Sequence, residues 1–178
     1  MPELLTLRGH GVHALVASRA VLRIEYKEYL RVAGLPAPAQ LARSEGQGGP
    51  VIWVSQVDAA GYCRWLGQQE GQAYRLPTMA ELLELAGESD LEGVSAEVWP
   101  HEHGNRPELR GGMKEMYLCE WTSETEVVRG PSQMGERVLG SIFYPPWLRP
   151  GNNAVQVQAH FPATEGYSFV TFRVARRA

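Results

Sequence analysis

Apolar residues recur at helical spacing near the start of the chain. In the stretch "VLRIEYKEYLRVAGLP" these residues are Leu22, Tyr26, Tyr29 and Leu30, with charged residues between them and Gly34 after them. Apolar positions three and four residues apart form one face of a helix, and glycine is a common stop signal. The pattern predicts an amphipathic helix. The proline-, glycine- and alanine-rich residues 36–50 that follow predict a surface loop.

Two further helices are predicted by start signals of the capping-box type. Residues 51–54 predict a short extended segment, and Ser55 with Asp58 three residues later then begins a helix that we expect to end at Gly67. Thr78 with Glu81 begins another. The expected core positions are Ala59, Cys63 and Leu66 on the first of these helices, and Leu82, Leu83, Leu85 and Ala86 on the second, which we expect to end at Gly87.

The second half of the chain has weaker periodicity. Residues 87–135 are rich in glycine and charge, so we expect loops and short strands there. Near the end, "YSFVTFRVA" alternates Val170, Phe172 and Val174 with Phe169, Thr171 and Arg173, which predicts a strand.

Composition and charge narrow the class of protein. The 178 residues suit one domain, residues 1–178, and 44% apolar with 21% charged residues is typical of a globular chain. A net charge of -3 argues against nucleic-acid binding. There is no pattern of a classical signal peptide or membrane span, so we expect no membrane insertion and a protein that is cytoplasmic, or exported or phage-borne by another route. The two cysteines, Cys63 and Cys119, are expected to be reduced thiols.

Four segments, in order, carry a resemblance to a known family. They are "EYKEYLRVAG", "PVIWVSQVDAAGYCRWLG" running to "YRLPTMAELLELA", "CEWTSE" and "FRVAR". They resemble the formylglycine-generating-enzyme, or sulfatase-modifying-factor, family. The resemblance implies an α+β chain with the C-type lectin fold of that family: short helices around small twisted antiparallel sheets, with much irregular loop.

The chain departs from the family where the family's enzymes have their reactive site. The resemblance implies a closely spaced pair of copper-binding cysteines before the final strand, but residues 137–161 contain no cysteine. Because copper(I) is selected by thiolates, we expect no cofactor and no oxidase chemistry of that kind. His10, His13, His101 and His103 have spacings that iron ligands could use, but we interpret them as polar loop residues.

Two other family features are altered. The family's calcium segment reads Met116 to Trp121 here, with tyrosine in place of the asparagine oxygen ligand, so we expect no calcium site. The family's Arg-Gly-Gly-Ser-Trp signature is reduced to "LGSIF". Trp121, Thr122 and Arg173 still match their motifs, and we interpret them as core residues, with the arginine in a buried ion pair.

Residues 141–161 have the composition of a recognition surface. Aromatic rings beside amides, held by prolines, are residue types that recognition loops use. The candidate ligand-binding residues are Ser141, Phe143, Tyr144, Trp147, Arg149, Asn152, Asn153, Val155, Val157 and His160. An alternative stays open for Phe143, Val155, Val157 and Phe161, since a hydrophobic run before a strand is often core.

This arrangement is most similar to the variable proteins of diversity-generating retroelements, a branch of the same fold. The resemblance implies that codons of the asparagine type are randomised in the segment before a final Phe-Arg-Val strand. The residues that could arise that way are Phe143, Tyr144, Arg149, Asn152, Asn153, Val155, Val157 and His160. Trp147, Gln156 and Gln158 could not and are expected to be fixed. The variable surface is expected to stop near His160 or Phe161.

Three functions follow as hypotheses. The first is a non-catalytic protein that binds a protein or other surface ligand through residues 141–160. The second is an oxidoreductase of the resembling family with an altered metal site. The third is a structural subunit of a phage or surface particle. The sequence does not specify the oligomeric state.

Overall fold

The computed structural model describes residues 3–9, 12–43, 49–88, 101–102, 116–129, 136–143 and 158–178. Its elements, in chain order, are β1 (Leu4–Gly9), β2 (Val12–Ala17), α1 (Arg23–Ala33), α2 (Ala39–Arg43), α3 (Gln56–Glu70), α4 (Met79–Glu88), β3 (His101–Glu102), β4 (Met116–Tyr117), β5 (Cys119–Arg129), β6 (Glu136–Phe143), β7 (Gln158–Pro162), β8 (Val170–Thr171) and β9 (Ala175–Arg177). None of the described helices combines the length and apolar character that a bilayer span requires.

The first two predicted helices form, but the second is longer than expected. Helix α1 ends at Gly34, which has a left-handed φ of 67°, and α3 begins at Ser55, whose hydroxyl accepts a hydrogen bond from the Asp58 N–H. Helix α3 passes through Gly67 and ends at Gly71 instead. Gly67 is needed for another reason: a Cβ there would lie 2.5 Å from the Gln72 carbonyl oxygen of the returning chain.

The helix predicted at Thr78 also forms, as α4, and two of its details differ from expectation. Gly87 lies inside α4 and does not end it, and Leu83 is 40% exposed, while Leu82 and Leu85 are buried as predicted. In the predicted loop 36–50, the short helix α2 buries Leu41 completely. That one apolar side chain fixes the helical turn against the core.

Residues 51–54 form no strand, although an extended segment was predicted there. The Val51 N–H donates to the Val21 carbonyl, and Pro50 makes an isolated bridge with Leu22. Trp53 has a positive φ of 63°, a conformation that costs a non-glycine residue about 1–2 kcal/mol. Its carbonyl lies so close to Gly166 that a Cβ at Gly166 would be 2.4 Å away.

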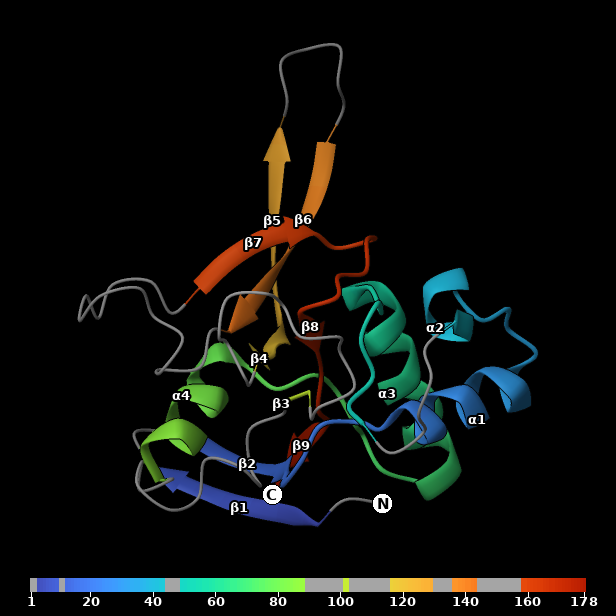
Figure 1. The fold of residues 1–178 in the computed structure, drawn as a ribbon. Helices are drawn as coiled ribbons and strands as arrows, with labels where there is room; N and C mark the ends of the chain where they lie inside the picture. The colour runs from blue at the N-terminus through green and yellow to red at the C-terminus, as the bar shows by residue number, and fades with distance from the viewer. Residues whose placement is uncertain are drawn as a thin grey trace.

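The described strands form three small sheets. One has the order β1-β2-β9 and another pairs β3 with β4. The third has the order β7-β6-β5-β8, antiparallel except where β8 pairs with β5. In Figure 1 the ends of β5 and β6 rise out of the body of the molecule. We call this part, residues 125–129 and 136–139, the arm; Val127, Val128 and Val138 on it are 56%, 40% and 48% exposed.

The core has two parts. The larger one contains an aromatic cluster in which Tyr26, Tyr29, Tyr62, Trp65 and Phe172 have neighbouring ring centroids 5.2 to 6.0 Å apart. Aromatic pairs in edge-to-face geometry stabilise a core beyond the area that they bury. The smaller part lies between the β1-β2-β9 sheet and α4, and includes Leu7, Val16, Leu82, Leu85 and Phe143.

The predicted C-terminal strand is divided in the structure. Between β8 and β9, the Phe172 and Val174 carbonyls accept hydrogen bonds from Val21 and Ala17, so the chain passes between other segments there and does not continue in a ladder. Val170, Phe172 and Val174 are buried as predicted. Thr171 and Arg173 are buried too, because this segment is covered on both sides.

Candidate functional site

The structure describes three of the predicted site residues, and they lie on two neighbouring strands. Ser141 and Phe143 lie on β6, His160 lies on β7, and Ser141 is the register partner of His160. The other seven fall outside the described residues: Tyr144, Trp147, Arg149, Asn152, Asn153, Val155 and Val157. The strands therefore define the base of the segment that was predicted to bind ligand.

Ser141 and Phe143 do not fit the predicted contact surface. Both are fully buried. Phe143 packs in the smaller core with Leu7 and Leu82, and the Ser141 carbonyl accepts a hydrogen bond from the Thr122 hydroxyl at 3.2 Å. A side chain without solvent exposure cannot contact a partner. These two residues therefore belong to the folded scaffold that holds the segment, which we call the frame. For Phe143 the alternative interpretation as a core residue is the right one.

His160 is exposed, as the prediction requires. Its Nε2 lies 3.6 Å from Glu126 Oε2, and the two side chains are 34% and 57% exposed. The pair spans β6, since His160 is on β7 and Glu126 is on β5. An ion pair this exposed contributes little to stability. Because His160 is exposed and belongs to neither part of the core, we expect its replacement to disturb the fold little.

A glutamine from α3 holds β5 and β6 in their geometry. The ladder between them shifts register between Trp121 and Thr125, which marks a bulge. Gln56 Nε2 fills this gap and donates to the carbonyls of Thr122 at 2.7 Å and Glu124 at 2.9 Å. On the facing strand, a Cβ at Gly140 would lie 2.6 Å from Gln56 Oε1. Bulges bend strands and increase their twist, and here the bend lies where the arm leaves the body.

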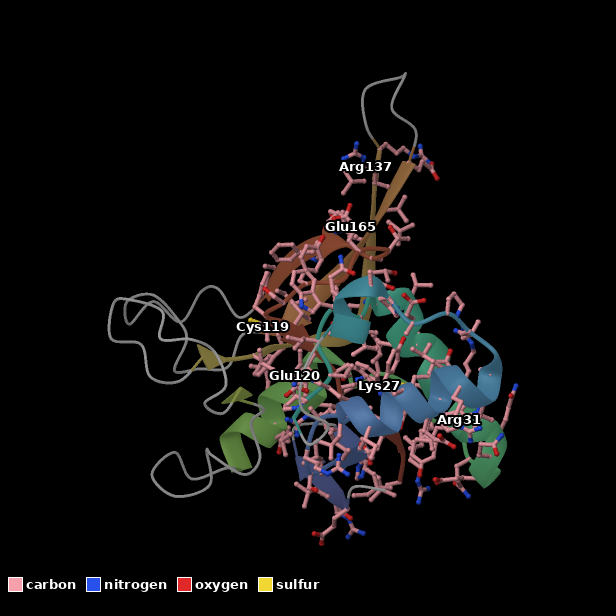
Figure 2. All side chains as sticks on the ribbon, turned by 45° about the vertical axis from the view of Figure 1, so that its right-hand side comes forward. Lys27, Arg31, Cys119, Glu120, Arg137 and Glu165 are labelled. Atoms are coloured by element: carbon pink, nitrogen blue, oxygen red, sulfur yellow. The ribbon has the colours of Figure 1, made fainter. Side chains whose placement is uncertain are left out.

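A buried ion pair fixes the other end of β5. Arg173 Nε and Nη2 donate to the two Glu120 carboxylate oxygens at 2.7 and 2.6 Å, and Arg173 Nη1 donates to the Ala17 carbonyl at 3.0 Å. Neither ionic side chain has any exposure. Figure 2 shows Glu120 among the central side chains, far from Arg137 on the arm. The predicted burial of Trp121, Thr122 and Arg173, with the arginine in an ion pair, is confirmed.

Both cysteines are buried and unpaired thiols. Burial raises the pKa of Cys63 to about 12 and that of Cys119 to about 12. Cys63 faces the core from α3, as predicted, and Cys119 begins β5. Because the thiolate is the nucleophilic form, this burial makes both thiols poor nucleophiles at neutral pH.

The histidines are placed differently from expectation. His13 lies on β2 and His101 on β3, so both are held by strands and not by loops, while His10 and His103 are outside the described residues. Within the part of the chain that the structure describes, no three metal-ligating side chains come together. His13 instead lines a cavity of about 460 Å³ beside Glu81 and Arg177.

The fold matches known structures over nearly the whole chain. The crystal structure of CarF has a TM-score of 0.63 and 15% identity, and the alignment covers 99% of this chain and 96% of CarF. PvdO from Pseudomonas aeruginosa has a TM-score of 0.56 and 15% identity, with 93% and 80% covered. At this identity the likeness concerns the fold alone. The predicted α+β, C-type-lectin-like fold of the formylglycine-generating-enzyme type is confirmed.

Sequence comparison identifies the family. The chain belongs to the family of sulfatase-modifying factor enzyme 1-like domains, whose model matches residues 19–117. The matched part contains helices α1 to α4, and it ends before β5. No protein with a curated description is significantly similar to the chain in sequence.

Proposed function

We propose that this protein is a non-catalytic binding protein that presents residues 144–157, together with His160, to a protein or other surface ligand. The observation that carries the proposal is the register of β6 and β7: Phe143 and Gln158 are partners, so the segment leaves and re-enters the sheet at neighbouring positions. Its ends are fixed by the frame whatever its own sequence is. Binding residues are commonly found on such connections between rigid elements.

The composition of the segment supports recognition. Tyr144 and Trp147 offer large rings that lose little conformational entropy on binding, and Asn152 and Asn153 offer adaptable hydrogen-bonding groups. Pro145, Pro146 and Pro150 restrict the backbone, which reduces the ordering that a partner would impose. A net charge of -3 gives no reason to expect a nucleic-acid partner.

We further propose that the segment is diversified, as in the variable proteins of diversity-generating retroelements. The burial of Ser141 and Phe143 moves the start of the variable surface to residue 144. Randomisation of either residue would disturb the core, whereas replacement of the exposed His160 would not. Trp147, Gln156 and Gln158 remain the positions expected to stay constant.

The properties of the cysteines support the proposal that the protein is not an enzyme of the thiol type. Residues 137–161 contain no cysteine. Cys63 and Cys119 lie on different elements, and burial keeps both thiols protonated at neutral pH. A copper site of the family's kind is built from a closely spaced pair of thiolates, and neither cysteine has a cysteine neighbour in the sequence.

The experiment is a comparison of two displayed libraries of the full chain. The first randomises Tyr144, Asn152, Asn153 and His160; the second randomises two buried residues, Ser141 and Phe143. Folded clones are counted by resistance to protease. We expect most clones of the first library to stay folded and to yield binders against unrelated protein targets, and most clones of the second to be cleaved. Loss of folding in the first library to the same extent as in the second would contradict the proposal.

A further inference from the structure

A concave site lies on the opposite edge of the sheet from β7. It is a cavity of about 340 Å³ between α3, residues 74–76 and β5. Its walls include the apolar side chains of Val57, Ala60 and Leu76, and Ser123 and Thr125 line the β5 side. A volume of this size lies in the range of small-ligand sites, which are mostly apolar with a few placed polar groups.

The charged side chains that line this cavity are both arginines, and one of them has carboxylate neighbours, Glu81 and Glu124. Two guanidinium groups line it, those of Arg64 and Arg75. Arg75 donates to both carboxylate oxygens of Glu81, at 2.7 and 2.5 Å. Burial of Glu81 opposes its ionisation, but the hydrogen bonds from Arg75 and Thr78 outweigh this and lower its pKa, so the pair is ionised at neutral pH. Arg64 is exposed and makes no ion pair with any residue that the structure describes.

The cavity adjoins a strand edge that other described segments leave open. Strand β8 pairs with β5 at Cys119 and Glu120, and the Ser123 N–H donates to the Pro77 carbonyl at 2.8 Å. Beyond Ser123, no described strand pairs with this edge of β5. Thr125 lines the cavity where this open edge begins, and the exposed Val127 follows two residues later on the same face.

We propose that this cavity binds the carboxyl-terminal end of an extended peptide. The peptide main chain lies along β5 from Thr125 outward and satisfies the open N–H and C=O groups, as in other cases of strand addition. Its last side chain is apolar and lies between Val57 and Leu76. Its terminal carboxylate pairs with Arg64, because guanidinium and carboxylate groups match in bidentate geometry.

A chain end explains the arrangement better than other anionic ligands. Val57 and Arg64 are two helical turns apart on the same side of α3, so the apolar wall and the cation face one cavity together. A carboxyl-terminal apolar residue carries both complementary groups on one residue. A free organic acid would fill the cavity but would leave the edge of β5 without a partner.

The test is chemical-shift mapping on the isotope-labelled full chain. The probe is the peptide acetyl-Thr-Val-Leu with a free carboxylate, compared with the same peptide as its carboxyl-terminal amide. We expect saturable shifts at the backbone amides of Ala60, Leu76 and Thr125. We expect about fivefold weaker binding for the amide, the effect of losing one solvent-exposed charge pair.

Two variants and one smaller probe complete the design. Arg64→Gln is expected to weaken binding of the carboxylate peptide about fivefold, to the level of the amide peptide. Arg31→Gln, on the exposed side of α1 (Figure 2), is the matched control and is expected to bind as the parent protein does. Equal affinity for acid and amide, no saturable shift at these residues, or binding of acetyl-leucine as tight as that of the peptide would each overturn the proposal. None of these outcomes bears on residues 144–157, because the two sites share no residue.

Discussion

Phe143→Ala tests where the frame ends and the presented segment begins. Phe143 has no solvent exposure and packs in the smaller core beside Leu7, Leu82 and Leu85. Removing a fully buried phenylalanine ring costs about 3–5 kcal/mol of unfolding free energy, through lost transfer energy and the cavity that remains. For a chain of this length, each kcal/mol lowers the melting temperature by about 2–4 °C, so we expect a decrease of about 6–20 °C.

The assay is thermal and urea unfolding of the parent and two variants. His160→Ala is the comparison, since this side chain is exposed and its contact with Glu126 is exposed too, so its loss should change stability by less than about 1 kcal/mol. The urea m-value should be unchanged in both, because the surface exposed on unfolding is the same. A melting temperature for Phe143→Ala within about 2 °C of the parent would mean that the ring is not in the core, and Phe143 would return to the candidate contact residues.

Three other predictions concern the frame and the thiols. Arg173→Met should lower the free energy of unfolding in urea by about 3–5 kcal/mol, because it removes the partner of the buried Glu120 carboxylate. Adding Glu120→Leu should recover most of that loss, and a double variant as unstable as the single one would contradict this. Cys63 and Cys119 should not react with a thiol reagent in the native protein at pH 8, because burial keeps both thiols protonated, and both should react after unfolding. Reaction in the native state would show that the thiols are accessible. Trp121→Ala should lower the free energy of unfolding in urea by about 3–5 kcal/mol, since the ring is fully buried and its Nε1 donates to the Val54 carbonyl at 2.8 Å. A decrease below about 1 kcal/mol would show that the ring does not stabilise the core.

The helices could be predicted from local signals because those signals report local physics. The hydroxyls of Ser55 and Thr78 each accept a hydrogen bond from a backbone N–H in the first turn of the helix that follows. The start of each helix can therefore be predicted from neighbouring residues alone. The C-terminal ends of the helices were harder to predict from the sequence. Gly67 serves close packing against a segment that arrives later in the chain, and glycine alone does not distinguish this role from a stop signal.

Strand β5 and the burial of Ser141 and Phe143 could not be predicted from the sequence, because both depend on contacts between segments that are separated in the chain. The inner part of β5 is covered on both faces and its outer part projects into solvent, so its apolar residues do not alternate. Ser141 is buried, and its carbonyl accepts a hydrogen bond from Thr122 on the neighbouring strand, a pairing that the residues around Ser141 do not reveal. By contrast, the buried ion pair of Arg173 could be predicted because the resemblance extended to that residue.

The most direct test of the central proposal is deep sequencing of the 3′ end of this gene across a population of its source. We expect substitutions concentrated at Tyr144, Asn152, Asn153 and His160 and at the other candidate positions within residues 144–157, with the codons for Phe143 and Trp147 constant. Uniform conservation of residues 144–160, or variation that extends through Phe143, would contradict a diversified surface presented from a fixed frame.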